Sequence, residues 1–246
     1  MRKEKVQVQV TKSFNNLLVL DDVKFNVNEN EFLVLVGPTG CGKTTLANII
    51  GGLSPPTEGQ VLIDGQPVDT RKHNLSFVFQ EPSCIPWRSL WDDVKIGLEI
   101  KGLAKISLEE RLRRVIHLVG LEGFENYYPH QISGGMKQRV AIARAYATEP
   151  DLLLMDEPFG HLDAQTRYLM QIEIIRIWEE MKRTVIFVTN NIEEAVYLAE
   201  RIIIFSKLPA KISGEIRVDL PRPRDNISPE FLAIRSCVSE LCEITE

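Results

Sequence analysis

Three short segments are apolar at every position, and they constrain the fold more than any other feature of the chain. These segments are Phe32–Val36, Leu152–Met155 and Val185–Val188. A strand without polar positions is typical of a sheet that is covered on both faces. Segments of helical character follow them, at about 43–52, 163–182 and 191–199. This alternation predicts an α/β fold with a largely parallel sheet, in which ligands bind beyond the carboxyl ends of the strands.

The rest of the chain predicts additions to this core. Val6–Val10 and Val19–Val27 alternate, at least in part, between apolar and polar residues, which favours antiparallel strands with one exposed face. Ser107 and Glu110 form a capping box ahead of a helical pattern, so we expect a helical insert. The prediction is one domain over residues 1–246. Its parts are a core with the β portion at about 1–82 and 136–222, a helical subdomain at about 83–135, and a C-terminal helix at about 223–246.

Composition narrows the class of protein. The 246 residues carry a formal net charge of −5 and no dense basic cluster, so binding of nucleic acid through its phosphates is not favoured. The four cysteines form no CxxC pair and no metal-binding spacing, which favours reduced thiols in a cytosolic chain. The N-terminus lacks the apolar stretch of a secretory signal. No run reaches the roughly 18 apolar residues that a membrane span needs.

A phosphate-binding loop follows the first apolar strand. The segment GPTGCGKTT matches the pattern G-x-x-x-x-G-K-[ST], and it stands between a predicted buried strand and a predicted helix, which is the context that the pattern requires. Its glycines let successive backbone N–H groups point at one phosphate chain, and the helix adds its positive end. The expected phosphate-binding residues are Gly37, Pro38, Thr39, Gly40, Cys41, Gly42, Lys43, Thr44 and Thr45. Lys43 is expected to reach the β- and γ-phosphates, and Thr44 to bind Mg²⁺.

Two adjacent carboxylates end the second apolar strand. Asp156 is expected to bind Mg²⁺ because a hard cation prefers oxygen ligands, and Glu157 is expected to orient and polarise an attacking water. A strand that ends in two solvated acids is common elsewhere. Here the strand is expected to neighbour the phosphate loop, which favours a catalytic role.

A third segment, QISGGMKQRVAIARA, indicates the family. Together with the two sites above, the chain resembles the ATP-binding cassette (ABC) ATPases, in which a Ser-Gly-Gly signature opens a helix. The resemblance implies a P-loop NTPase core, RecA-like, with an antiparallel β portion and a helical insert. It also implies a head-to-tail dimer in which Ser133, Gly134 and Gly135 contact the γ-phosphate of ATP held by the other subunit. The second subunit could be identical or different.

The other family elements occur in the expected order. Phe14 stands where the family stacks an aromatic ring on adenine, and Gln80 stands in the glutamine loop, close to Mg²⁺ and the water. Gly160–Asp163 resembles the D-loop, so Asp163 is expected at the dimer seam. The segments DEPFGHLDAQTR and LPRPRDNISPEF resemble the ATPases of nitrate-, sulfonate- and taurine-type importers. The implied partners are integral-membrane permease subunits and, indirectly, a periplasmic or surface solute-binding protein. The implied location is the cytoplasmic face of the membrane, as a peripheral subunit.

One position departs from the family. Asn190 stands where ABC ATPases carry the switch histidine, and Asn191 follows it. An asparagine can donate a hydrogen bond to a γ-phosphate oxygen, but it is shorter than histidine and cannot be cationic. By analogy with the loss of one preorganised donor, hydrolysis is expected to fall ~10²–10³-fold while ATP binding suffers less.

Three functions follow from these patterns. The first is an ATPase with ATP and Mg²⁺ that powers import of a small solute. The second is a soluble ABC protein acting on ribosomes or DNA, which the single cassette and the acidic balance disfavour. The third is an ATP-binding regulatory subunit with little turnover, which Asn190 motivates.

Overall fold

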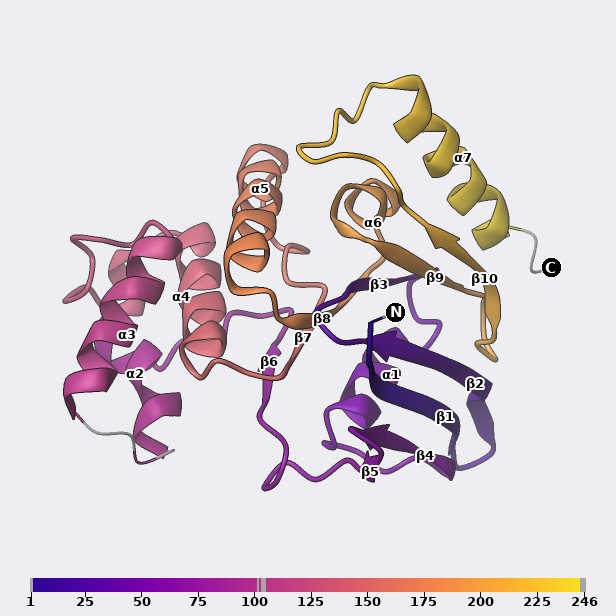
Figure 1. The fold of residues 1–246 in the computed structure, drawn as a ribbon, viewed down its shortest axis with the longest axis horizontal. Helices are drawn as coiled ribbons and strands as arrows, with labels where there is room; N and C mark the ends of the chain where they lie inside the picture. Colours follow the sequence, from indigo (N-terminus) through magenta and orange to yellow (C-terminus); the bar gives the residue numbers. More distant parts are fainter. Residues whose placement is uncertain (1, 101, 103–104, 244–246) are drawn as a thin grey trace. The chain divides into compact units, whose positions relative to one another are not determined.

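The computed structural model describes residues 2–100, 102 and 105–243. Residues 244–246 of the expected C-terminal helical segment therefore lie outside the described residues. The chain forms two compact units, drawn in Figure 1. The first unit combines the residues up to His73 with those from Lys182 onward, and the second unit is Asn74–Met181.

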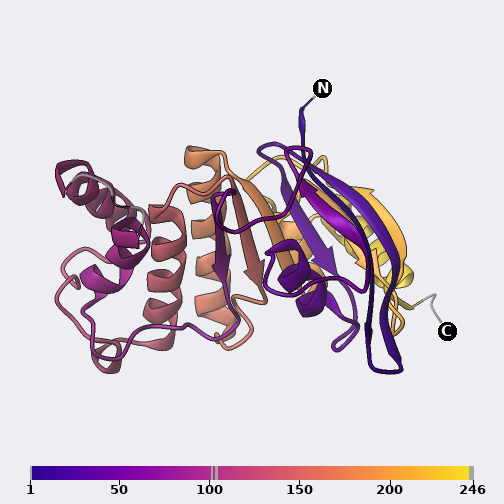
Figure 2. The same cartoon turned by 90° about the horizontal axis from the view of Figure 1, so that it is seen from below.

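The first unit contains the antiparallel sheet that the alternating segments predict. The sheet has the order β2-β1-β4-β5. Its strands are β1 (Glu4–Phe14), β2 (Leu17–Asn28), β4 (Glu58–Ile63) and β5 (Gln66–Pro67). Figure 2 shows the long strands β1 and β2 running side by side, in agreement with their pairing. Val6, Val8 and Val10 are buried while Gln7 and Gln9 are exposed, because successive side chains of a strand point to opposite faces.

A second set of strands in the first unit places the predicted sites. In the order β10-β9-β3-β8, β3 (Phe32–Val36) pairs in parallel with both β8 (Thr184–Thr189) and β9 (Arg201–Phe205). Strand β10 (Ile212–Arg217) is antiparallel to β9. Every residue of β3, β8 and β9 is buried, as was predicted for the apolar runs Phe32–Val36 and Val185–Val188 but not for β9. Val36, the last residue of β3, pairs with Thr189 and with Ile204, so the loops that follow the three strands begin side by side.

Three helices cover these strands. Helix α1 (Lys43–Ile50) contacts β8, and α6 (Ile192–Leu198) contacts β3 and β8. Helix α7 (Pro229–Glu243) packs on α6, β9 and β10, and Figure 1 shows it beside α6. The helix begins after Ser228, whose hydroxyl accepts a hydrogen bond from the Phe231 amide at 3.3 Å. The helix lies within the segment at about 223–246 that was predicted to be helical, and it begins at Pro229.

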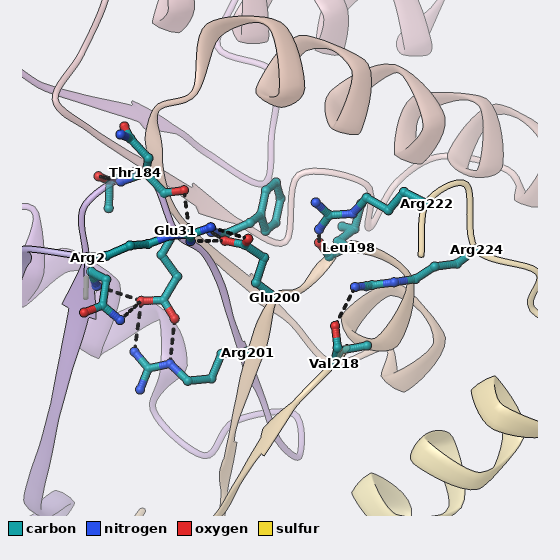
Figure 3. Close-up of polar contacts among 12 residues, drawn as sticks. Arg2, Glu31, Thr184, Leu198, Glu200, Arg201, Val218, Arg222 and Arg224 are labelled. Atoms are coloured by element: carbon teal, nitrogen blue, oxygen red, sulfur yellow. Dashed lines mark hydrogen bonds and ion pairs between the residues drawn. The ribbon is translucent and has the colours of Figure 1, made fainter. Parts of the chain in front are cut away.

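A polar network fixes the other end of β3 and β9 (Figure 3). Arg201 Nε and Nη2 donate to the two carboxylate oxygens of Glu31, at 2.7 and 3.1 Å, and both side chains are buried. Glu200 accepts a hydrogen bond from the Phe32 amide at 3.1 Å and pairs with Arg2. Each acid directly precedes one strand and binds the first residue of the other. Because an unpaired buried charge is costly, this reciprocal pairing disfavours a shift of β3 against β9.

The second unit pairs two parallel strands with a group of helices. Strand β6 (Leu75–Val78) runs parallel to β7 (Leu152–Asp156), with Val78 opposite Met155. The helices are α2 (Leu90–Ile100), α3 (Lys105–Leu118), the 3₁₀ turn η1 (Pro129–Gln131), α4 (Gly134–Ala147) and α5 (Ala164–Met181). Helix α4 contacts α2, α3 and β6.

Helix α3 begins at Lys105, so Ser107 lies inside the helix and the capping box expected at Ser107 is wrong. The helix thus begins three residues before Leu108, the first helical residue that the capping pattern predicts. None of the helices in the described part of the chain combines the length and the apolarity that crossing a bilayer demands.

Candidate functional site

The loop after β3 has a backbone that only glycine fits at two positions. Gly42 has a φ of 108°, and a Cβ atom built on it would lie 2.8 Å from Cγ1 of Val19. A Cβ on Gly37 would lie 3.0 Å from the Cβ and the carbonyl oxygen of Phe205, at the end of β9. A left-handed φ and a close approach of two backbones are the two conditions under which glycine is required. The loop is therefore packed tightly against β2 and β9.

Lys43 lies within this loop. Its ammonium donates to the carbonyl oxygens of Gly37 and Pro38, both at 2.8 Å, and only 5% of the residue is exposed. Cys41 Sγ is 3.8 Å from the same nitrogen. Thr44, the expected Mg²⁺ ligand of this loop, is exposed at the start of α1. The loop thus combines the positive charge of Lys43, the N-terminus of α1 and the accessible hydroxyl of Thr44. These groups together favour binding of a phosphate chain.

The two asparagines after β8 have different contacts. Asn190 Nδ2 donates to the Thr39 hydroxyl at 3.4 Å, so Asn190 lies directly beside the phosphate loop. Asn191 is the N-cap of α6, because its side-chain oxygen accepts from the amides of Glu193 and Glu194, at 2.9 and 3.2 Å. This capping role was not predicted from the sequence. An asparagine directly before an acidic helical segment was the available signal.

Phe14 lies at the far end of the first strand pair. It ends β1, faces Leu17 across the turn to β2, and is 49% exposed. The Lys12 ammonium lies 4.9 Å from the centre of its ring and donates to the Pro55 carbonyl at 2.7 Å. The turn thus presents an aromatic face that is accessible to a flat ligand.

The second unit holds the two carboxylates. Asp156 ends β7 and is 5% exposed, and Glu157 follows with a φ of 42°. A left-handed backbone at a residue other than glycine costs of the order of 1–3 kcal/mol and is concentrated at functional sites. The Gly160 amide donates to the Glu157 carbonyl at 3.0 Å, and a Cβ on Gly160 would lie 3.4 Å from Gln80 Nε2. The structure therefore brings Gln80 to the segment that begins at Glu157.

The second unit also joins the Ser-Gly-Gly segment to the D-loop. Ser133 caps α4 by accepting a hydrogen bond from the Met136 amide at 3.3 Å. A Cβ on Gly135 would lie 2.7 Å from Cγ2 of Thr166. Thr166 in turn donates to Asp163 from its amide at 3.0 Å and from its hydroxyl at 2.7 Å. These hydrogen bonds, the one from the hydroxyl first, hold the pKa of Asp163 below its usual value.

The expected site residues thus fall into two groups. The first unit carries Phe14, the phosphate loop and Asn190, and the second carries Gln80, Asp156, Glu157, Ser133–Gly135 and Asp163. Within each unit, contacts link residues that are distant in the sequence. The expected Mg²⁺ ligands are divided between the units. Their roles, like those of the phosphate-binding residues, stay predictions.

The comparisons with known proteins decide the family. A family model described as ABC transporter matches residues 20–160 of this chain. The chain is an ABC ATPase. A protein of Methanocaldococcus jannaschii described as an uncharacterized ABC transporter ATP-binding protein is 49% identical to it over 95% of the chain and 89% of that protein. The predicted family, fold class and ATPase activity are therefore confirmed.

Two further relatives have more specific descriptions. An aliphatic sulfonates import ATP-binding protein of Bacillus cereus is 41% identical to this ABC ATPase, over 95% of the chain and 92% of that protein. A solved ATP-binding cassette, described as dimeric and in a post-hydrolysis state with ADP and Pi, is 33% identical. It superposes with a TM-score of 0.75 over 88% of this chain and 100% of the cassette.

The contacts of the two asparagines predict unequal effects of their removal on stability. Asn191→Ala is expected to lower the free energy of unfolding by about 0.5–2 kcal/mol, because the first turn of α6 loses its cap. Asn190→Ala is expected to change that free energy by no more than ~0.5 kcal/mol, because Asn190 is exposed and its hydrogen bond to Thr39 is long. Urea unfolding of the two variants measures both values. Equal destabilisation would contradict the division of roles.

Proposed function

We propose that this ABC ATPase is the ATP-binding and ATP-hydrolysing subunit of an importer for a small solute of the nitrate, sulfonate and taurine class. The observation that carries the proposal is the similarity to the sulfonate import protein, which extends over nearly the full length of both chains. The segments that resemble such importers in the sequence support the same class.

Each unit supplies one part of the chemistry in this proposal. Lys43 and the amides of the phosphate loop bind the triphosphate, and Phe14 stacks on the adenine. Thr44, Gln80 and Asp156 would hold Mg²⁺, since a hydroxyl, an amide oxygen and a carboxylate are the hard donors that this ion prefers. When bound, the ion neutralises charge on the phosphate oxygens. Glu157 orients the attacking water, and its left-handed backbone fixes the direction from which its side chain leaves the chain.

The proposal includes an ATP-dependent dimer. Ser133, Gly134 and Gly135 open α4, where the free amides and the helix dipole favour an anion. In the dimer this anion is the γ-phosphate of ATP bound to the other subunit, which is a second copy of this chain or a related ABC ATPase. Asp163 lies next to Thr166, against which Gly135 packs, and this contact supports a joint role at the dimer seam. The dimeric state of the solved relative supports the same arrangement.

The dimer is tested with a charge at Gly134. In the described part of the chain, and apart from its own helix turn and chain neighbours, no heavy atom lies within 4 Å of a Cβ at this position, so Gly134→Ala fits the fold and the side chain of Gly134→Glu starts in open space. In a Glu157→Gln background that slows hydrolysis, ATP is expected to double the mass of the protein and of its Gly134→Ala variant in light scattering. Gly134→Glu is expected to stay monomeric, because its carboxylate repels the phosphate. ATP-dependent dimers of Gly134→Glu would refute the trans contact.

Asn190 reduces hydrolysis in this proposal. It lies beside Thr39 and offers a neutral donor to the γ-phosphate. We expect Asn190→His to raise the rate of phosphate release by up to ~10²-fold and to leave the affinity for ATP almost unchanged, because the phosphate loop provides most of the binding. Asn190→Gln is the matched control, since it adds length without positive charge. An unchanged rate in Asn190→His would remove Asn190 from the explanation.

A regulatory ABC subunit with little turnover is the second candidate, and the neutral residue at 190 is the observation that favours it. Turnover of the purified protein, measured alone and with its permease, separates the two functions. An importer subunit is stimulated by the permease, whereas a regulatory subunit stays slow in both measurements.

The partners in this proposal are a permease, which the ATPase meets at the cytoplasmic face of the membrane, and a solute-binding protein. Trp87, which is 78% exposed, and Phe79 offer apolar surface on the second unit for the permease. With the permease in vesicles, we expect the sulfonate-loaded binding protein to raise ATP hydrolysis above the rate with the empty protein. Stimulation by a sugar-loaded binding protein instead would refute the solute class.

A further inference from the structure

One arginine of α4 binds the loop that follows β6. Arg144, in the last turn of α4, donates from Nη1 to the carbonyl oxygen of Ser83 at 2.8 Å and from Nη2 to the Ser83 hydroxyl at 2.9 Å. The same Nη1 also donates to Asp93 Oδ1 of α2 at 2.7 Å. The guanidinium is a rigid planar group, so it fixes the loop in both distance and direction. The sequence motifs assign Arg144 no role, although it lies in the segment QISGGMKQRVAIARA.

The carboxylate of Asp93 is buried and binds the same loop. Its side chain is 1% exposed, and that of Arg144 is 19% exposed. The second carboxylate oxygen, Oδ2, accepts a hydrogen bond from the Ile85 amide at 2.9 Å. Because a buried carboxylate without partners is costly, the arginine and the loop are held together at this acid. The pair thus binds the loop at Ser83 and at Ile85.

The two helices that carry this pair are packed closely. A Cβ on Gly97 of α2 would lie 2.7 Å from Cγ2 of Thr148, the C-cap of α4. Cys84 adds a contact between the loop and α4, since its thiol donates to the Lys137 carbonyl at 3.6 Å. Burial raises the pKa of Cys84 to about 11, so the thiol keeps its proton at neutral pH. The loop is therefore bound to two helices that hold each other in place.

Gln80 lies between two fixed points of the backbone. On one side Val78 ends β6, which is paired with β7, and on the other side Ser83 is bound by Arg144. The segment between these points is short, at residues 79–82. A short segment with both ends fixed has few conformations, so its ends determine where Gln80 lies. In this conformation the Gln80 amide reaches the segment that begins at Glu157.

We propose that Arg144 is a positioning residue for Gln80. By binding Ser83 and Asp93, Arg144 fixes the loop so that the Gln80 amide stays at the segment that begins at Glu157, and it acts on ATP hydrolysis through Gln80. The effect on hydrolysis rests on the role that the proposed function gives to Gln80. The anchoring of the loop does not rest on that role.

The experiment is a double-mutant cycle on the purified full chain. Arg144→Lys keeps a positive charge beside Asp93 but loses the fork that binds Ser83. We expect it to lower kcat for ATP hydrolysis by about tenfold to a hundredfold, because a displacement of ~1 Å can cost up to ~10²-fold. The KM for ATP should stay almost unchanged, since the phosphate loop belongs to the first unit. In a Gln80→Ala background, Arg144→Lys should lower kcat no further, because the positioned side chain is missing.

Two further variants and a second measurement complete the experiment. Ser83 is exposed, so Ser83→Ala removes one of the contacts without disturbing the core, and it should lower kcat in the same direction but by less. Arg139→Lys, on the same helix, is the matched control and should keep kcat, because a lysine can still donate to the Val119 carbonyl that Arg139 binds. Hydrogen–deuterium exchange of the peptide 79–85 should become faster in Arg144→Lys and stay unchanged in Arg139→Lys.

The outcomes separate this proposal from the proposed function. An equal loss of kcat with and without Gln80 would show a general structural effect and overturn the positioning role. The same holds if Gln80→Ala lowers kcat while Arg144→Lys does not. If Gln80→Ala itself leaves kcat unchanged, the role of Gln80 in the proposed function is refuted. The exchange of the peptide 79–85 then decides the anchoring, and an unchanged rate in Arg144→Lys would overturn it.

Discussion

The parallel pairing of β3 between β8 and β9 is the constraint on which the candidate site of the first unit depends. Because Val36 stands opposite both Thr189 and Ile204, three loops start at one edge of the sheet. One loop carries the phosphate-binding pattern, one carries Asn190, and the third follows Phe205, the last residue of β9, which packs against Gly37. The buried pair of Glu31 and Arg201 resists a change of this register from the opposite end of the strands.

The segment after β8 divides two tasks between neighbouring residues. The side-chain oxygen of Asn191 accepts hydrogen bonds from two amides in the first turn of α6, which stabilises that helix. Asn190 is left beside Thr39, where a neutral amide can donate a hydrogen bond but cannot offset phosphate charge. In the proposed function, such a site would retain the groups that bind the triphosphate and would give up part of the stabilisation that speeds its cleavage.

The second unit concentrates strain and close packing in a short stretch around the two carboxylates. Glu157 has a left-handed backbone, Gly160 approaches Gln80, and Gly135 approaches Thr166. Gln80, the segment Glu157–Gly160 and Gly135 come from distant parts of the sequence. The close approaches favour glycine at positions 135 and 160. A side chain at Gly135 would therefore displace Thr166, and one at Gly160 would press on Gln80, independently of any contact with nucleotide.

The sequence by itself determined the family, the fold class, the buried strands and most residues of the candidate site. Apolar runs and the glycine pattern of the phosphate loop could be recognised because each reflects the backbone geometry of one continuous segment. Only the tertiary structure decided what lies beside these segments. The capping role of Asn191, the contact between Asn190 and Thr39, and the binding of Ser83 by Arg144 involve side chains whose neighbours are fixed by packing. The tertiary structure also decided the start of α3 at Lys105, because the contacts of α3 with α2 and α4 outweigh a local capping pattern.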